Sequence, residues 1–167
     1  MKIIIDTREK QPLDFGFIEI ERIKLDEGDY TARELLDYEE KTGSKTVRIE
    51  RKASITELAN NLSKGFDTFE KEMKRLFDYE RKILLLEFNP DNIKHFPFKC
   101  GLPNHIIFRK NKKGKYVRNI RMDGTQILNK LEYIKNIYDV EIIFAGSREY
   151  SAQLIETILQ DAIQKIS

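Results

Sequence analysis

The sequence predicts an α/β domain built on a central mixed β-sheet flanked by helices. Short apolar runs with strand character alternate along the chain with segments whose apolar residues recur at helical spacing, as is typical of that class. The 167 residues, of which 40% are hydrophobic, suit one domain, residues 1–167, with one sizeable core. No apolar run approaches the roughly 20 residues that a membrane-spanning helix needs, so no membrane association is expected.

The expected strands follow from apolar runs, taken in chain order. Residues 2–7 contain three consecutive isoleucines and are typical of a buried strand, either parallel or central in its sheet. Residues 18–25 alternate loosely and predict a second strand. Residues 30–36 are expected to form another strand, followed by a polar turn at 39–45. The remaining expected strands are 46–52, 82–88 and 140–145.

The expected helices begin at residues that can cap them. Ser54 followed by Glu57 fits a capping box, which predicts a helix from that point. A second helix is expected from Asp67, with an apolar stripe formed by Phe69, Met73, Leu76 and Phe77. Two further helices are expected after Asp123 and Ser147.

The strongest pattern for chemistry is Asp29 followed by Glu50 and Lys52 on the next strand. Residues two apart on a strand point to the same face, so Glu50 and Lys52 can reach one site while Arg51 points away. Two carboxylates can hold a hard cation, and a nearby ammonium group can orient an attacking water, as phosphodiester cleavage requires. The alternative is a turn aspartate beside a charged surface strand, since such spacings are frequent in charged chains.

A second acidic group follows the first strand, in the segment that contains Asp6, Arg8 and Glu9. The carboxylates of Asp6 and Glu9 are candidates to join the same metal site, and Arg8 is a candidate to hold a phosphate by bidentate bonds. The alternative is a charged loop with a local ion pair. The spacing leaves both open.

Positive charge is concentrated in one segment, although the chain carries a net charge of only +2. From Asp91 to Asp123 there are nine basic and two acidic residues, a net of +7, and the other 21 basic and 26 acidic residues give −5. Residues 104–122 predict a basic hairpin-like insertion, with arms at 105–110 and 115–121. Its cations are expected to contact DNA phosphates, and Phe108 and Tyr116 to stack on an exposed base; the alternative is a solvated hairpin. The cations are Arg109, Lys110, Lys112, Lys113, Lys115, Arg118 and Arg121.

Three blocks in order, residues 4–13, 27–30 and 49–52, resemble the XPF-type structure-specific DNA endonucleases, whose nuclease core is of the PD-(D/E)xK superfamily. The resemblance implies a restriction-endonuclease-like fold, Mg²⁺ as cofactor with Mn²⁺ able to replace it, and cleavage of branched DNA near single-strand/duplex junctions. It also implies a homodimer, for which the apolar last helix is a candidate interface; complete burial of that helix in the monomer is the alternative. The family's site residues fall on Asp6, Glu9, Asp29, Glu50, Arg51 and Lys52. We expect Arg8 and Arg51 to hold phosphates or to be structural.

The chain departs from the family pattern in two places. The family's aspartate after the lysine falls on Thr56, and Glu57 lies one residue later. Glu57 therefore either replaces that aspartate at the metal or only closes the capping box with Ser54. The helix-hairpin-helix module of many family members does not follow, so the basic segment or a partner subunit is expected to supply the additional DNA binding.

Together these observations predict a metal-dependent DNA endonuclease acting on flap, fork or Holliday-junction DNA. Two alternatives are a non-catalytic DNA-binding or scaffold subunit, and a general DNA nuclease of the same superfamily. The single cysteine, Cys100, excludes an intramolecular disulfide and suggests a reducing, intracellular location.

Overall fold

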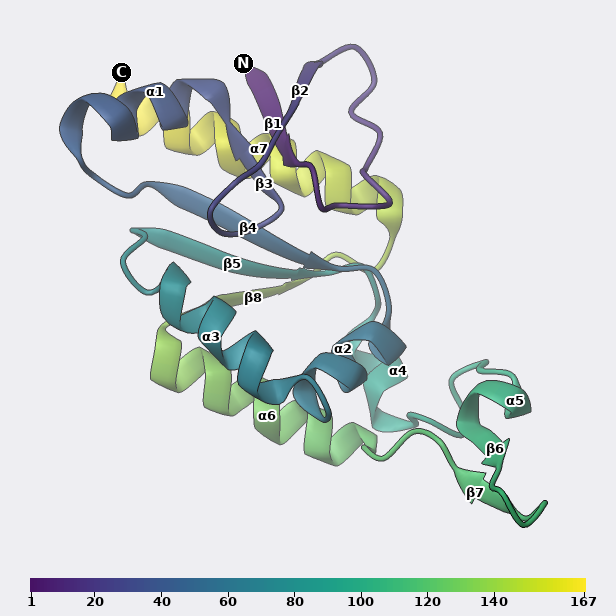
Figure 1. The fold of residues 1–167 in the computed structure, drawn as a ribbon. Coiled ribbons are helices and arrows are strands. Elements are labelled where there is room, and N and C mark those ends of the chain that lie inside the picture. Colours follow the sequence, from purple (N-terminus) through teal and green to yellow (C-terminus); the bar gives the residue numbers. More distant parts are fainter.

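A six-stranded mixed sheet forms the body of the protein in a computed structural model that describes all residues, 1–167 (Figure 1). The strand order is β2-β1-β3-β4-β5-β8. The pairs β1·β3 and β3·β4 are antiparallel and the other neighbours are parallel, so the predicted α/β class with a mixed sheet is confirmed. The strands are β1 (Lys2–Asp6), β2 (Glu19–Ile23), β3 (Tyr30–Ala32), β4 (Val47–Lys52), β5 (Arg81–Leu86) and β8 (Glu141–Phe144).

Helices cover both faces of the sheet (Figure 1). On one face lie α1 (Arg33–Thr42) and α7 (Arg148–Ile166). The other face carries α2 (Ile55–Leu62), α3 (Phe66–Leu76) and α6 (Gly124–Tyr138). The predicted caps are present, since Ser54, Asp123 and Ser147 each accept a hydrogen bond from the third residue beyond them. No helix is both long and apolar enough to cross a bilayer.

Alternate residues of β5 line two separate hydrophobic cores. Ile83 and Leu85 pack into the core beneath α1 and α7, whereas Leu84 and Leu86 pack into the core beneath α2, α3 and α6. All four side chains are fully buried, which explains why this strand is a continuous apolar run. Burying each such side chain stabilises the fold by about 1.5–3 kcal/mol before conformational entropy is subtracted.

The same alternation in β4 positions the polar residues that follow its apolar start. Val47 and Ile49 pack into the core under α7. Glu50 and Lys52 therefore point to the opposite face, where the Lys52 ammonium lies 5.4 Å from the centre of the Phe69 ring on α3. Arg51 points back to the α7 side.

The strand predicted over residues 30–36 is wrong beyond Ala32, and the polar turn predicted at 39–45 is present only after Thr42. The structure has a helix, α1, over Arg33–Thr42. This segment is rich in Arg, Glu, Leu and Lys, which favour helix, and it ends at Gly43 in the left-handed conformation. Leu35 is the one residue of α1 that is fully buried.

The apolar residues of α7 pack inside the chain. Ile155, Ile158 and Leu159 are buried in the core that α7 shares with β1, β4 and β5, and Leu154, Ile163 and Ile166 pack partly buried against the same core. Burial in the monomer therefore accounts for Ile155, Ile158 and Leu159, whereas Leu154, Ile163 and Ile166 are only partly buried. The homodimer remains a prediction.

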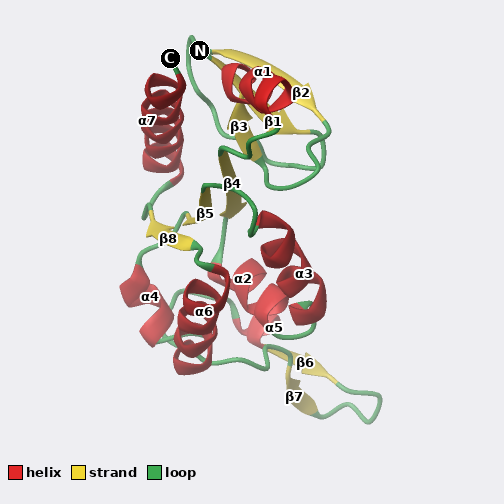
Figure 2. Cartoon of the chain, turned by 90° about the vertical axis from the view of Figure 1, so that its left-hand side faces the viewer, coloured by secondary structure: helices red, strands yellow, loops and turns green.

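Residues 104–122, which we call the basic arm, project beyond α2 and α4 (Pro90–Lys94) at one end of the molecule (Figures 1 and 2). The arm holds a short helix, α5 (Asn104–Ile107), and a hairpin of β6 (Phe108–Lys110) and β7 (Tyr116–Arg118). The predicted hairpin is present, but residues 105–107 are helical rather than extended. At the root of the arm, Ile107 and Ile120 are buried and Asn119 N donates to Ile107 O at 2.7 Å.

Candidate active site

Asp29 is fixed at the start of β3 by backbone hydrogen bonds to strands on both sides. Its N–H donates to Ile49 O at 2.8 Å, and its carbonyl accepts from Asp6 N at 2.8 Å. The preceding Gly28 has φ +73°, and a Cβ there would lie 3.2 Å from Ile49 O. Glycine at this position therefore permits both the left-handed turn and the close approach to β4 that bring Asp29 beside Glu50.

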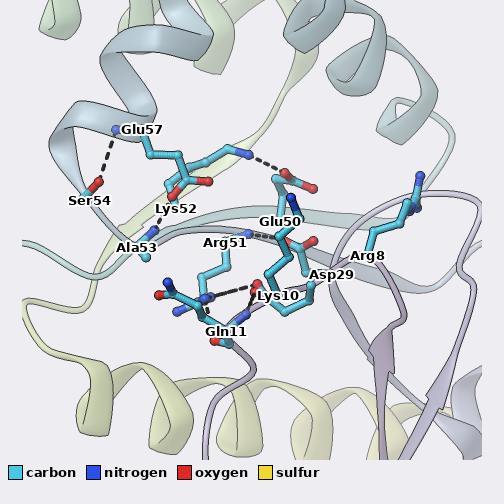
Figure 3. Close-up of a pocket in the computed structure, with 11 residues that line it drawn as sticks. Arg8, Lys10, Gln11, Asp29, Glu50, Arg51, Lys52, Ala53, Ser54 and Glu57 are labelled. Atoms are coloured by element: carbon cyan, nitrogen blue, oxygen red, sulfur yellow. Dashed lines mark hydrogen bonds and ion pairs between the residues drawn. The ribbon is translucent and has the colours of Figure 1, made fainter.

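Asp29, Glu50 and Lys52 meet in one open cavity of about 570 Å³ (Figure 3). Lys52 Nζ lies 2.6 Å from Glu50 Oε1, and Arg51 N donates to Asp29 Oδ2 at 2.8 Å. The structure thus brings together the three residues that the sequence singled out. The cavity is lined by Arg8, Glu9, Lys10, Gln11, Asp29, Glu50, Arg51, Lys52, Ala53, Ser54 and Glu57.

The negative charges of Asp29 and Glu50 repel each other across the cavity. Burial raises the pKa of Asp29 well above its usual value, and the negative charge of Glu50 raises it further. Burial lowers the pKa of Lys52, but the adjacent Glu50 more than reverses this, so the pKa of Lys52 is raised overall and its ammonium stays charged. One ammonium group therefore faces two carboxylates, and additional positive charge would stabilise this arrangement.

The donor set fits a hard divalent cation. Asp29 Oδ1 and Glu50 Oε2 are not used in hydrogen bonds within the protein, in contrast to their partner oxygens. No third Asp, Glu, His or Cys side chain is close enough to complete a cluster of three ligands. Mg²⁺ is commonly held by one or two carboxylates with water and substrate phosphates in the other positions, so two carboxylates suffice.

Asp6 does not reach this cavity. Its carboxylate is fully buried and accepts hydrogen bonds from Arg8 N at 2.6 Å, Arg8 Nε at 2.8 Å and Leu25 N at 2.6 Å. Burial raises the pKa of Asp6, but the hydrogen bonds from Arg8 and Leu25 outweigh that effect and lower the pKa overall. Asp6 therefore holds the loop that carries Arg8, and Arg8 itself remains 56% exposed at the cavity.

Arg51 braces the loop that carries Glu9 instead of facing solvent. Its side chain is 3% exposed, pairs with Glu9 Oε2 at 3.1 Å and with Glu87, and donates to Gln11 O at 2.9 Å. Arg148 at the start of α7 also donates to Gln11 O. This geometry favours the structural alternative for Arg51 over phosphate binding, and it leaves Glu9 paired with Arg51.

Glu57 serves the start of α2. Its N–H donates to Ser54 Oγ at 3.1 Å, and its Oε2 accepts from Ala53 N at 3.0 Å. In a standard capping box the Glu57 carboxylate would accept from Ser54 N–H, but here it accepts from the N–H of the preceding residue, Ala53. Glu57 lines the cavity wall without joining Asp29 and Glu50 in a ligand cluster.

Two residues at the site were not singled out from the sequence. Lys10 is exposed at the cavity mouth, next to Glu9. Glu72 on α3 lines an adjoining pocket with Arg8 and Glu50, and burial followed by the charge of Glu50 raises the pKa of Glu72. Glu72 lies three residues after Phe69, on the buried stripe of α3; a carboxylate within that apolar stripe was the available signal.

Comparisons with known proteins agree with this geometry. The family model described as the ERCC4 domain matches residues 5–158. The solved structure of XPF from Aeropyrum pernix superposes with a TM-score of 0.62 at 17% identity, covering 99% of this chain and 67% of that chain. XPF from Aeropyrum pernix in complex with DNA gives a TM-score of 0.59 at 15% identity, covering 98% of this chain and 66% of that chain. The chain thus spans about two thirds of the length of these structures. No sequence among the curated proteins is similar enough to count as a match.

Proposed function

The chain belongs to the ERCC4 domain family, and from this premise we propose that it is a metal-dependent endonuclease that hydrolyses phosphodiester bonds in branched DNA. The observation that carries the proposal is the meeting of Asp29, Glu50 and Lys52 in one open, charged cavity. The similarity of the fold to an XPF structure in complex with DNA supports DNA as the substrate.

Asp29 and Glu50 would hold Mg²⁺, or Mn²⁺ in its place, through the two oxygens that make no hydrogen bond within the protein. A cation held there supplies Lewis-acid polarisation of the scissile phosphate and a more acidic water. Neutralisation of the two carboxylates also removes the repulsion that raises the pKa of Asp29.

The protein's own cations do the remaining work. Lys52, held in place by Glu50, orients the attacking water and offsets negative charge that builds on the phosphate. Arg8 and Lys10 lie at the cavity mouth, where they can bind the phosphates on either side of the scissile bond. Asp6 and Arg51 are positioning residues, because they fix the loop that carries Arg8, Glu9 and Lys10.

The test is cleavage of end-labelled flap, fork, Holliday-junction and linear duplex DNA with Mg²⁺, Mn²⁺ or EDTA, using wild type and Asp29→Asn. We expect metal-dependent cutting of the branched substrates only, lost in the variant. Equal cutting of linear duplex would favour the general-nuclease alternative. Tight binding without cutting in any metal would favour the non-catalytic scaffold and refute the proposal.

A further inference from the structure

One face of the arm's hairpin carries alternating aromatic rings and cations. In the strand register Phe108 pairs with Arg118 and Lys110 pairs with Tyr116. Directly opposed residues share a face, as do residues two apart on one strand, so all four side chains lie on the same side. The Lys110 ammonium stands 5.3 Å from the centre of the Tyr116 ring, and the Arg118 guanidinium 5.2 Å from that of Phe98 in the preceding loop.

These rings are exposed around an open cavity. Tyr116 is 71% and Phe98 57% exposed, and the Phe98 ring centre lies 6.3 Å from that of Phe108. A single exposed aromatic residue is ordinary, but here the exposed Tyr116 and the half-buried Phe108 line one cavity, and the exposed Phe98 lies beside Phe108. The cavity, which we call the ring pocket, measures about 530 Å³ and is lined by Asn104, His105, Phe108 and Tyr116. The amide and imidazole groups there add hydrogen-bonding groups suited to the edge of a base.

The ring pocket stands on a fixed base. Ile120 is buried in the core beneath α2, α3 and α6, and Ile106 packs partly buried against it. Ile107 is also buried, and Asn119 closes the root of the arm through its bonds to the carbonyls of Ile106 and Ile107. Arg118 also donates to Met122 O at 3.2 Å. The root therefore holds the rings in place before any ligand arrives, which lowers the entropic cost of binding.

The charge around the pocket selects its occupant. No acidic residue lies between Asp91 and Asp123, and nine basic residues do. Such a surface matches a phosphodiester chain. Duplex DNA would contact only the cations, through its phosphates. Its paired bases are stacked inside the helix and offer no free face to the aromatic rings. Exposed rings interleaved with cations are the features that recognise unpaired bases.

We propose that the ring pocket binds one unpaired DNA base, stacked on Tyr116 and Phe108, while the arm's cations hold the adjoining phosphates. The inference rests on the proposed function and deepens it, because it names an unpaired segment as the feature of branched DNA that the arm recognises.

The test combines a change in the DNA with a change in the protein. Anisotropy in EDTA would measure binding of a labelled thymine oligonucleotide and of an abasic oligonucleotide of equal length and charge. Wild type should bind the thymine strand about tenfold more tightly, the ratio that corresponds to roughly 1.4 kcal/mol of stacking. Tyr116→Ala should bind both strands with nearly equal affinity, whereas Tyr116→Phe should keep the preference.

A charge variant separates phosphate contacts from base contacts. Replacing Lys112, Lys113 and Lys115 by Ala should weaken binding of both strands and flatten the salt dependence, yet leave the preference for bases intact. Loss of the base preference in this variant would count against a pocket made by the rings.

The outcomes for the pocket and for the nuclease are distinct. Equal binding of both strands by wild type, or an unchanged preference in Tyr116→Ala, would overturn the ring pocket and point to a protein partner or a second copy of the chain. Metal-dependent cutting measured in parallel would survive that result. A base preference lost in Tyr116→Ala, in a protein that never cuts, would support the pocket and refute the nuclease.

Discussion

Replacing Asp29 by Asn should make the metal-free protein more stable while it removes cleavage. Burial and the neighbouring Glu50 raise the pKa of Asp29, so ionising this carboxyl costs more free energy in the folded state than in the unfolded state. The amide of Asn is nearly isosteric, and its oxygen can still accept from Arg51 N. The substitution therefore removes the repulsive charge and keeps the hydrogen bond.

The size of the gain depends on pH in a calculable way. The pKa of Asp29 is higher in the folded state than in the unfolded state. The loss of stability caused by its ionisation is therefore absent when the pH is below the unfolded-state pKa and complete when the pH is above the folded-state pKa. Between the two values, the stability advantage of Asp29→Asn should grow by about 1.4 kcal/mol per pH unit. At pH 7 we expect a gain of at least about 1 kcal/mol, the scale seen when functional residues are neutralised, or about 2–4 °C in Tm.

Urea unfolding followed by circular dichroism from pH 4 to pH 8, with EDTA present, measures this difference. Mg²⁺ should then stabilise wild type but not Asp29→Asn, because the cation binds only the folded protein that keeps both carboxylates. A variant that is less stable than wild type at pH 7, or equally stabilised by Mg²⁺, would refute the reasoning.

Asp6→Asn is the matched control, because it makes the same chemical change at a buried carboxyl whose pKa is lowered. The amide nitrogen of Asn would face N–H groups that now donate hydrogen bonds to the Asp6 carboxylate. If the buried Leu25 N–H loses its acceptor in this way, the cost is about 1–3 kcal/mol. The stability given by Asp6 is present above its unfolded pKa and is lost as the pH falls through its folded pKa. Asp6→Asn should therefore destabilise the protein at pH 7, with the opposite sign to Asp29→Asn.

Four further substitutions test the scaffold of the fold and of the site. Arg51→Ala should destabilise the protein by about 3–5 kcal/mol in urea unfolding, since it leaves Glu9 without its ion-pair partner and Glu87 with only the more distant Arg148; a loss below about 1 kcal/mol would contradict the structural role of Arg51. Gly124→Ala should cost about 1–3 kcal/mol, because the new Cβ would lie 1.8 Å from Ile93 O. Gly65→Ala, whose Cβ would meet only ordinary contacts, should cost clearly less in the same assay. Gly28→Ala forces about 1–2 kcal/mol of left-handed strain on the turn before Asp29, and under the proposed function it should lower the cleavage rate more than DNA affinity; an unchanged rate would show that the turn does not position the site.

The central part of the site could be predicted from the sequence because it depends on strand periodicity. Glu50 and Lys52 are two apart on β4, so any sheet that buries Val47 and Ile49 turns both toward the opposite face. The turn at Gly28 then needs only one neighbouring strand to bring Asp29 beside them. These are local rules, and they hold whatever the rest of the chain does.

The parts that failed depend on contacts between distant segments. Nothing near Asp6 in the sequence shows that Leu25 N will occupy its second oxygen, and nothing near Arg51 shows that Glu87 will bury its guanidinium. The helix at Arg33–Thr42 was missed for a different reason, since it contains few apolar residues and only Leu35 among them is fully buried. Nothing in the sequence near Glu72 shows that it will line a pocket with Arg8 and Glu50, which come from other parts of the chain.

The closure of the arm at its root has an engineering consequence. Because Asn119 N bonds to Ile107 O, the chain enters and leaves the arm at nearly the same point, and the scaffold experiences only that short gap. Loop-closure entropy changes slowly with length, so residues between these two points can be shortened, extended or exchanged at small thermodynamic cost. The segment can therefore be exchanged as a unit, which allows the ring pocket to be redesigned without altering Asp29, Glu50 or Lys52.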